Sequence, residues 1–143
     1  MKQHFYWNYV GSKDYYPLFN LVIENYTKAI ELNPSFDIAY NNRGVAYAAL
    51  TKYNNRDYTK AINDYNKAID INPNYVEAYY NRGVAYQNLK KYTEAIADYT
   101  MAIELNPNYA DAYDGRGAAY EAMGNKSKAK SDHNKAYKIR NKR

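Results

Sequence analysis

Apolar residues recur along the chain at intervals of three and four, the spacing at which side chains line one face of a helix. Two such faces follow each other in the middle of the chain; the first comprises Ala78, Tyr79, Ala85, Tyr86 and Leu89, and the second Tyr92, Ala95, Ile96, Tyr99, Ala102, Ile103 and Leu105. The pattern predicts seven helices, near residues 15–32, 37–52, 57–71, 75–89, 92–105, 109–123 and 126–140. An eighth, short helix would fit within residues 3–11. A β-sheet would contradict this prediction.

The helical pattern is repeated. The segments AYNNRGVAY (39–47), AYYNRGVAY (78–86) and AYDGRGAAY (112–120) are copies of one another, and their arginines are 39 and 34 residues apart. Ala61, Ala95 and Ala129 are spaced by 34 and 34. The first unit therefore holds a five-residue insertion between Leu50 and Ala61, around YNNRD at 53–57. We interpret it as a tolerated lengthening of a turn, with a secondary contact as the alternative.

Two further features recur in each unit. Asn-Pro pairs at 33–34, 72–73 and 106–107 separate consecutive units, because proline ends one helix and suits the first turn of the next. Gly44, Gly83 and Gly117 lie inside helical patterns, where glycine costs about 1 kcal/mol relative to alanine. We expect each glycine to lie where two helices approach too closely for a Cβ atom.

These residues resemble the tetratricopeptide repeat family, whose period is 34 residues. The signature is carried by Tyr79, Arg82-Gly83, Tyr86, Ala95, Tyr99 and Pro107, with copies on either side, and it spans about residues 20 to 140. The resemblance implies an all-α, right-handed superhelical α-solenoid of antiparallel helix pairs, with a concave groove lined by the first helix of each pair. Its implied function is to bind a peptide or partner protein as a non-enzymatic adaptor. The expected organisation is an N-terminal aromatic segment with a degenerate half repeat (1–36), then repeats at 37–75, 76–109 and 110–143.

Arg43, Arg82 and Arg116 stand where the family usually has leucine. Aspartates occur in step with them, at Asp64, Asp98 and Asp132, just before the aromatic position of the second helix. We expect a bidentate arginine–aspartate pair inside each helix hairpin, with a structural role.

The 20 tyrosines suggest an aromatic ligand cage, but most have a simpler explanation. Thirteen occupy repeat-equivalent positions, namely Tyr26, Tyr40, Tyr47, Tyr58, Tyr65, Tyr75, Tyr79, Tyr86, Tyr92, Tyr99, Tyr109, Tyr113 and Tyr120. We expect these thirteen to pack between helices.

The two ends of the array differ. In the last unit Lys130 replaces the isoleucine found at 62 and 96, and His133 replaces a tyrosine, so 126–140 is predicted to be a polar, basic capping helix. At the front, the apolar stripe of helix 15–32 needs a cover, which the aromatic residues of 5–10 would supply. The alternatives are that the chain is a fragment or that it self-associates through this end.

Positions that diverge between units are candidates for the binding groove. They are Asn41, Val45, Ala48, Glu77, Tyr80, Val84, Gln87, Asp111, Asp114, Ala118 and Glu121. The front of this groove is mildly apolar, Tyr80 is the expected anchor, and the back is acidic, so a partner with basic residues is predicted. Two alternatives remain: the acidic face is only solvated, or the basic tail folds across the groove and pairs with its carboxylates.

A subclass of the family grips a C-terminal carboxylate with basic and asparagine side chains. Asn81 matches one clamp position, but Asn41, Val45, Asp111 and Gly115 occupy the others. A carboxylate clamp is therefore not expected.

Composition narrows the function further. The chain has no cysteine, and His4 and His133 lie at opposite ends, so neither a metal site nor a cofactor is expected. Neither a secretory signal nor a membrane span is visible, which makes a cytoplasmic location the default. Residues 126–143 contain eight basic residues and one acidic residue, Asp132, so the net charge of +5 arises in this segment. Nucleic-acid binding through this basic helix is the alternative function, although Tyr137 is its only aromatic residue.

Overall fold

The computed structural model describes residues 16–51 and 57–142 of the chain, and these residues form seven helices and no strand. The helices are α1 (Tyr16–Leu32), α2 (Asp37–Thr51), α3 (Thr59–Ile71), α4 (Val76–Asn88), α5 (Tyr92–Leu105), α6 (Ala110–Ala122) and α7 (Lys126–Arg140). The seven predicted helices are confirmed, each end within two residues. The short helix expected within 3–11, the aromatic cover at 5–10 and most of the insertion lie outside the described residues.

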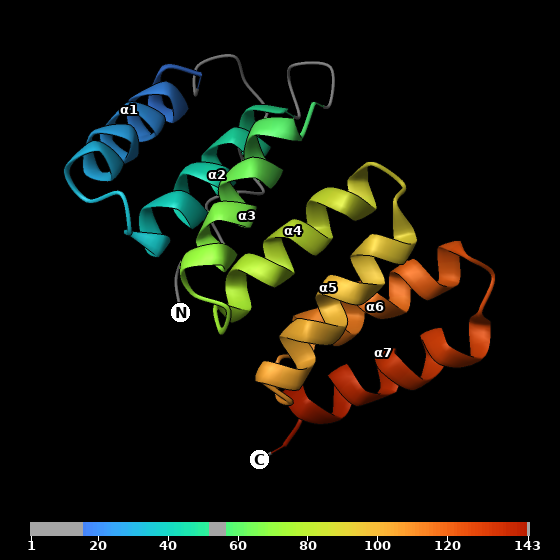
Figure 1. The fold of residues 1–143 in the computed structure, drawn as a ribbon. Helices are drawn as coiled ribbons and strands as arrows, with labels where there is room; N and C mark the ends of the chain where they lie inside the picture. Colours follow the sequence, from blue (N-terminus) through green and yellow to red (C-terminus); the bar gives the residue numbers. More distant parts are fainter. Residues whose placement is uncertain (1–15, 52–56, 143) are drawn as a thin grey trace.

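The helices stack in chain order from α1 at one end of the array to α7 at the other (Figure 1). The hairpins are α2 with α3, α4 with α5, and α6 with α7, and α1 packs on α2 ahead of them. The first helices also touch in succession, α2 with α4 and α4 with α6. Over the described ranges the second helices α3, α5 and α7 make no such contacts with one another. The row of first helices is therefore the inner, concave side of the array.

The core consists mostly of small alanines, with a few large aromatic residues among them. The alanines at 39, 46, 61, 68, 78, 85, 95, 102, 112, 119, 129 and 136 are almost fully buried. Such small residues bring helix backbones close together, and Tyr65 and Tyr99 fill the remaining space between them. All thirteen repeat-equivalent tyrosines are buried or half-buried, which confirms their packing role. No helix in the described part of the chain has the length and apolar character to cross a membrane.

The repeated glycines lie where the sequence pattern predicts close approach. A Cβ atom on Gly44 would lie 2.7 Å from the Tyr65 ring, and one on Gly83 would lie 3.0 Å from the Tyr99 ring. In the last hairpin the neighbour of Gly117 is His133, at 2.9 Å. Each glycine thus makes room for the ring of its own partner helix, and His133 takes the place that tyrosine has in the other hairpins.

The arginine–aspartate pairs are present in all three hairpins. Nε and Nη2 of Arg43 donate to Asp64 at 2.8 and 2.7 Å. The same atoms of Arg82 donate to Asp98 at 2.8 and 2.7 Å. Those of Arg116 reach Asp132 at 2.8 and 2.9 Å. The prediction is confirmed, including its bidentate geometry.

Each arginine also reaches a third helix, a contact that was not predicted from the sequence. Its remaining Nη1 group donates to a polar side chain on the second helix of the preceding unit. The acceptors are Thr27 (3.1 Å) for Arg43, Asn66 (2.7 Å) for Arg82 and Thr100 (3.1 Å) for Arg116. These acceptors keep the same 39- and 34-residue spacing as the arginines, a signal that was available in the sequence. We call each such contact set an arginine link; it joins three successive helices.

Hydrogen bonding and burial shift the pKa values of the charged groups in these links. Hydrogen bonds to aspartate raise the pKa values of Arg43, Arg82 and Arg116 above their ordinary value, so the guanidinium groups stay charged. At Asp98, burial raises the pKa of the carboxyl, and the hydrogen bonds from Arg82 act against that rise. The desolvation of this carboxylate therefore offsets much of its attraction to Arg82, as is usual for buried ion pairs.

The asparagine of each Asn-Pro pair has a specific role in the turn. Its Oδ1 accepts a hydrogen bond from the backbone N–H two residues later: Asn33 accepts from Ser35 (3.2 Å), Asn72 from Asn74 (3.1 Å) and Asn106 from Asn108 (3.1 Å). This side-chain turn sets the chain reversal after the second helix of a hairpin, and proline then favours entry into the next helix.

The turns inside the second and third hairpins use a left-handed residue, and this feature gives a stability prediction. Lys90 has φ 59°, and Gly124, one 34-residue repeat later, has φ 80°. Both donate a backbone hydrogen bond of 2.9 Å to the residue three positions earlier, so the two turns are equivalent. Because a Cβ atom disfavours this conformation, we expect Lys90→Gly to raise the free energy of unfolding by about 0.5–1 kcal/mol.

Urea unfolding followed by circular dichroism measures this change. The reciprocal variant Gly124→Ala is the matched control and should lose about 1 kcal/mol. A loss of stability in Lys90→Gly would contradict the assignment of Lys90 as a strained position.

Candidate functional site

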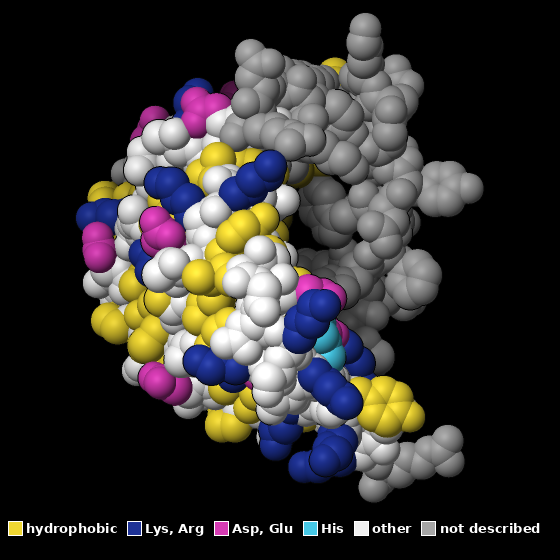
Figure 2. Space-filling view, turned by 90° about the vertical axis from the view of Figure 1, so that its right-hand side faces the viewer, with side chains coloured by type: hydrophobic (Ala, Val, Ile, Leu, Met, Phe, Trp, Pro, Cys, Tyr) yellow, Lys and Arg dark blue, Asp and Glu magenta, His cyan; other side chains and the backbone are white. Residues whose placement is uncertain are grey.

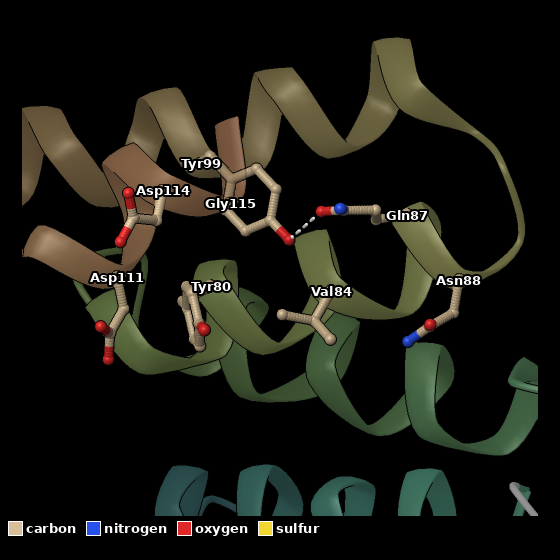
Figure 3. Close-up of a pocket in the computed structure, with 8 residues that line it drawn as sticks. All are labelled: Tyr80, Val84, Gln87, Asn88, Tyr99, Asp111, Asp114 and Gly115. Carbon is tan, nitrogen blue, oxygen red and sulfur yellow. Dashed lines mark hydrogen bonds between the residues drawn. The ribbon is translucent and has the colours of Figure 1, made fainter. Parts of the chain in front are cut away.

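A pocket of about 360 Å³ opens between α4 and α6 (Figure 3). Tyr80, Val84, Gln87 and Asn88 line it from α4, where their spacing of three and four places them on one face. Asp111, Asp114 and Gly115 line it from α6 by the same rule, and Tyr99 of α5 lies between the two helices. The pocket belongs to the inner row of helices, where the groove was predicted.

Tyr99 forms the floor of this pocket because position 115 is glycine. A Cβ atom on Gly115 would lie only 2.6 Å from the Tyr99 ring. The Tyr99 hydroxyl donates to Oε1 of Gln87 at 2.7 Å, which fixes the ring in the pocket. The earlier units carry Asn42 and Asn81 at the position of Gly115. The loss of that asparagine in the third unit is what lets the ring lie beneath the pocket.

Tyr80 forms an aromatic wall of the pocket. Its ring centroid lies 5.8 Å from that of Tyr99 and 5.0 Å from that of Tyr109, in tilted arrangements. Burial raises the pKa of Tyr80, the carboxylate of Asp111 adds to the rise, and Arg140 opposes it. The phenol is therefore neutral at physiological pH and presents a half-buried aromatic surface to any ligand.

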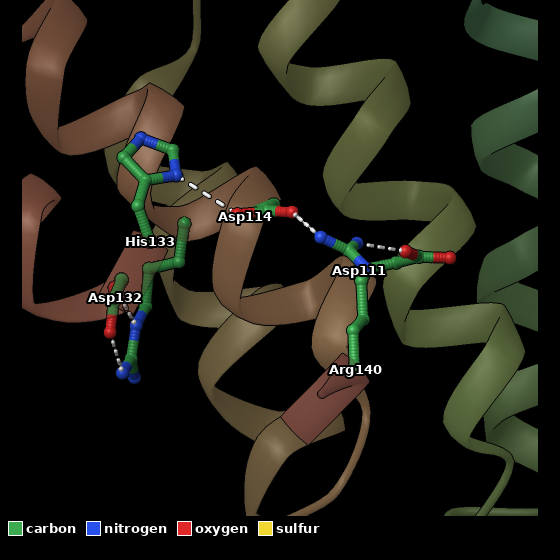
Figure 4. A network of polar contacts seen from close by, with 6 residues as sticks. Asp111, Asp114, Asp132, His133 and Arg140 are labelled. Atoms are coloured by element: carbon green, nitrogen blue, oxygen red, sulfur yellow. Dashed lines mark hydrogen bonds and ion pairs between the residues drawn. The ribbon is translucent and has the colours of Figure 1, made fainter. Parts of the chain in front are cut away.

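The acidic end of the pocket is already paired with α7. Nη2 of Arg140 donates to Oδ1 of Asp111 at 2.6 Å, and Nη1 of Arg140 donates to Oδ2 of Asp114. Nδ1 of His133 lies 2.9 Å from the other oxygen of Asp114, Oδ1 (Figure 4). Figure 2 shows basic, acidic and histidine side chains lying side by side on the surface. The basic tail thus engages two of the four predicted carboxylates, one of the alternatives left open by the sequence.

The network keeps Asp114 ionised. Burial alone would raise the pKa of this carboxyl, but hydrogen bonds from His133 and Arg140 outweigh it and lower the pKa below its ordinary value. The same contacts with Asp114 and Asp111 raise the pKa of Arg140. The pocket therefore ends in a carboxylate pair bound to a guanidinium group.

The remaining predicted groove residues lie elsewhere. Val45 and Ala48 pack on the buried cluster of Ala61, Tyr65 and Ala85, so they belong partly to the core. Ala118 is half-buried, and Glu77 and Glu121 are exposed.

Asn41 is the most buried of the predicted groove residues. It is only 5% exposed, and its Oδ1 accepts from Nδ2 of Asn81 at 3.0 Å while its Nδ2 donates to Asn42 at 3.3 Å. Asn41 therefore joins α2 to α4, and its place in the binding groove stays a prediction. It was predicted as a groove residue because the residue at this position differs between units. Such differences also occur where a residue contacts a neighbouring unit whose side chains differ.

Sequence reasoning placed Tyr80, Val84, Gln87, Asp111 and Asp114 in the groove, and all five line the pocket. The predicted set of groove residues does not include Asn88, Tyr99 or Gly115, and the alternative of a basic tail across the groove named neither Arg140 nor His133. Within residues 16–51 and 57–142, no three His, Cys, Asp or Glu side chains gather as a metal site would require.

Comparison with known families gives matches along most of the chain. Models described as tetratricopeptide repeat match residues 76–109 and 110–143, and a model described as TPR repeat matches residues 23–51 and 51–90. No curated protein sequence matches significantly.

Several solved structures are similar in fold. One is a crystal structure of MamA, with a TM-score of 0.75 and 29% identity over 86% of this chain and 69% of that one. Another is the first TPR of Spaghetti (RPAP3) bound to the HSP90 peptide SRMEEVD, with a TM-score of 0.69 and 31% identity over 78% of this chain and 86% of that one. The second TPR of Spaghetti, bound to the same peptide, has a TM-score of 0.64 and 29% identity over 72% and 91% of the two chains.

Proposed function

The chain belongs to the tetratricopeptide repeat family, and on that premise we propose that it is an interaction module that binds a peptide or partner protein in its concave groove. Similar structures that hold a peptide support the general role. The observation that carries the proposal for this chain is the pocket between α4 and α6, with its aromatic wall and acidic end. In this proposal the module holds its partner and performs no chemistry of its own.

The lining of the pocket indicates the chemistry of the partner. Tyr80 and Val84 offer an apolar surface large enough for one small side chain, and half-buried aromatic residues dominate binding energy at protein interfaces. Asp111 and Asp114 at the adjacent end favour a positive charge. We therefore propose a partner segment with a basic residue next to a small apolar one.

This partner differs from the peptide bound by the Spaghetti domains. SRMEEVD carries three acidic residues, whereas the pocket here presents carboxylates of its own. Asn81, which matches one position of the carboxylate clamp, donates to Asn41. These features support a basic partner rather than an acidic tail.

We expect Tyr80→Ala to weaken binding of a basic, valine-containing peptide library about tenfold or more, because the apolar anchor is lost. Fluorescence anisotropy at several salt concentrations measures the affinity. Binding to the wild type should weaken as salt rises, since the charged part of the contact is screened. Tyr80→Phe keeps the ring and is the matched control, and Tyr137→Ala removes a tyrosine that is 68% exposed on α7.

An acidic library should bind more weakly than the basic one. The double variant Asp111→Asn/Asp114→Asn should reduce this preference. Equal binding of both libraries to the wild type, or an unchanged preference in the double variant, would remove the acidic end from the proposed site.

A further inference from the structure

Arg140 binds the same two carboxylates that a basic partner residue would use. We propose that the acidic end of the pocket is an arginine-binding subsite, and that Arg140 is its internal occupant, which a partner arginine displaces. This inference rests on the proposed function and adds the identity of the basic residue and a means of regulating the site.

The first support is the geometry of the two carboxylates. Asp111 and Asp114 are three residues apart on α6, so they project from one face of the helix. The two terminal nitrogens of Arg140 are divided between them, one to each carboxylate. The planar fork of a guanidinium group can span two acceptors in this way, whereas the ammonium of lysine is a single compact charge. The subsite should therefore prefer arginine to lysine.

The second support is the orientation of Asp114. His133 contacts Oδ1 of this carboxylate, and Arg140 contacts Oδ2 (Figure 4). His133 packs against Gly117, so its ring is held by the hairpin itself. One oxygen of Asp114 is thus held by the fold, and the other faces the guanidinium position.

The third support is the exposure of Arg140. Its side chain is 47% exposed, and its partners Asp111 and Asp114 are 34% and 35% exposed. In the arginine link of the same hairpin, Arg116 and Asp132 are only 18% and 9% exposed. Ion pairs as exposed as those of Arg140 add little to stability, so displacing Arg140 from them should cost little free energy.

The fourth support comes from the repeat. The positions equivalent to Arg140 in the earlier units are Asn72 and Asn106, which form the Asn-Pro turns. In the last unit this position is still helical, because α7 ends with Arg140 itself, whereas α5 ends one residue before Asn106. The arginine is therefore not part of the repeated architecture, and its contacts with α6 occur in this unit alone among the described residues.

The competition has a measurable consequence. When a binding-competent state is only partly populated, the apparent affinity falls by that fraction. Because the exposed contacts of Arg140 are weak, we expect its removal to tighten binding of an arginine peptide about three- to tenfold.

The test uses the full chain and three labelled peptides, acetyl-GVRVG and its lysine and citrulline counterparts, with affinity measured by fluorescence anisotropy. The variants are Arg140→Ala, Arg140→Gln, which keeps a helix-favouring side chain, and Lys138→Ala. Lys138 is exposed on the same helix and is the control for loss of one positive charge. Circular dichroism melting confirms that each variant is folded.

We expect both Arg140 variants to bind the arginine peptide more tightly than Lys138→Ala does, with arginine preferred to lysine and citrulline bound weakly by all. If the arginine peptide binds the Arg140 variants and Lys138→Ala equally, the internal occupant is disproved while the proposed function stands. Equal affinity for the arginine and lysine peptides disproves the arginine subsite. If none of the peptides, and no basic library, binds any variant, the proposed function fails as well.

Discussion

The Tyr99→Ala variant should lose about 3–5 kcal/mol of its free energy of unfolding. Tyr99 is 1% exposed, and its ring lies against Gly83 of α4 and Gly115 of α6. It therefore fills the junction of three helices, α4, α5 and α6, where the two glycines against its ring have no side chain that could move into the space. The cost of a large-to-small change depends on how far a site can collapse, and this junction has little capacity to do so.

Urea unfolding followed by circular dichroism measures the loss. Tyr99→Phe keeps the ring and removes only the hydrogen bond to Gln87, so it should lose about 1 kcal/mol. Tyr137→Ala, at an exposed position, should change stability by less than about 0.5 kcal/mol. A loss below about 1 kcal/mol for Tyr99→Ala would show that this ring is not part of the core.

Removal of one member of an arginine link should be nearly as severe. We expect Arg82→Ala to lose about 3–5 kcal/mol, because the carboxylate of Asp98 would stay buried without its partner. Asp98 is 4% exposed, and Arg82 also supplies the hydrogen bond to Asn66 on α3. Both the hairpin and its attachment to the preceding unit are therefore affected.

The double variant Arg82→Met/Asp98→Leu separates two quantities: the stability lost when one partner of the ion pair is removed, and the net contribution of the intact pair to stability. It should recover most of the loss, since apolar replacement of a whole buried pair is often neutral. Chemical unfolding of the single and double variants gives the comparison. If Arg82→Ala alone loses less than about 1 kcal/mol, Asp98 is better solvated than its burial indicates.

The stability of Arg82→Ala should depend on pH, because the pKa of Asp98 is raised in the folded protein. Burial raises the pKa of Asp98 in the folded protein, so this group favours folding below its unfolded pKa and loses that contribution as the pH rises through its folded value. Without Arg82, the opposing hydrogen bonds are gone and the pKa rises further. The stability deficit of Arg82→Ala should therefore be smaller near pH 4 than near pH 7.

Most of the fold was predictable because it depends on properties that recur. Helical periods, Asn-Pro turns, close-packed glycines and the pairs of Arg43, Arg82 and Arg116 with their aspartates all repeat in the sequence, so each copy supports the others. The attachment of these arginines to the preceding unit repeats as well, at Thr27, Asn66 and Thr100. It was missed because threonine and asparagine are common on helix surfaces and carry no charge that calls for a partner.

The candidate site was less predictable because it is made by departures from the repeat. Gly115 replaces an asparagine, and only its contact with Tyr99 shows that the change deepens the surface into a pocket. Arg140 lies 26 and 29 residues from Asp114 and Asp111, and no period in the sequence connects them. A contact that occurs once in a chain has no second copy to confirm it, so it requires the structure.

The arginine links also determine how the array should come apart. In a repeat protein, stability is divided between the intrinsic terms of single repeats and the interface terms between neighbours, and the ratio of the two sets the cooperativity. Each arginine link contributes to both terms at once, since one guanidinium group bonds within its hairpin and across to the unit before it. Opening one hairpin thus breaks bonds that its neighbour also needs, which favours concerted opening over fraying from one end. The five-residue insertion in the sequence between Leu50 and Ala61 does not interrupt this coupling, because Arg43 bonds to Asp64 of α3 and to Thr27 of α1.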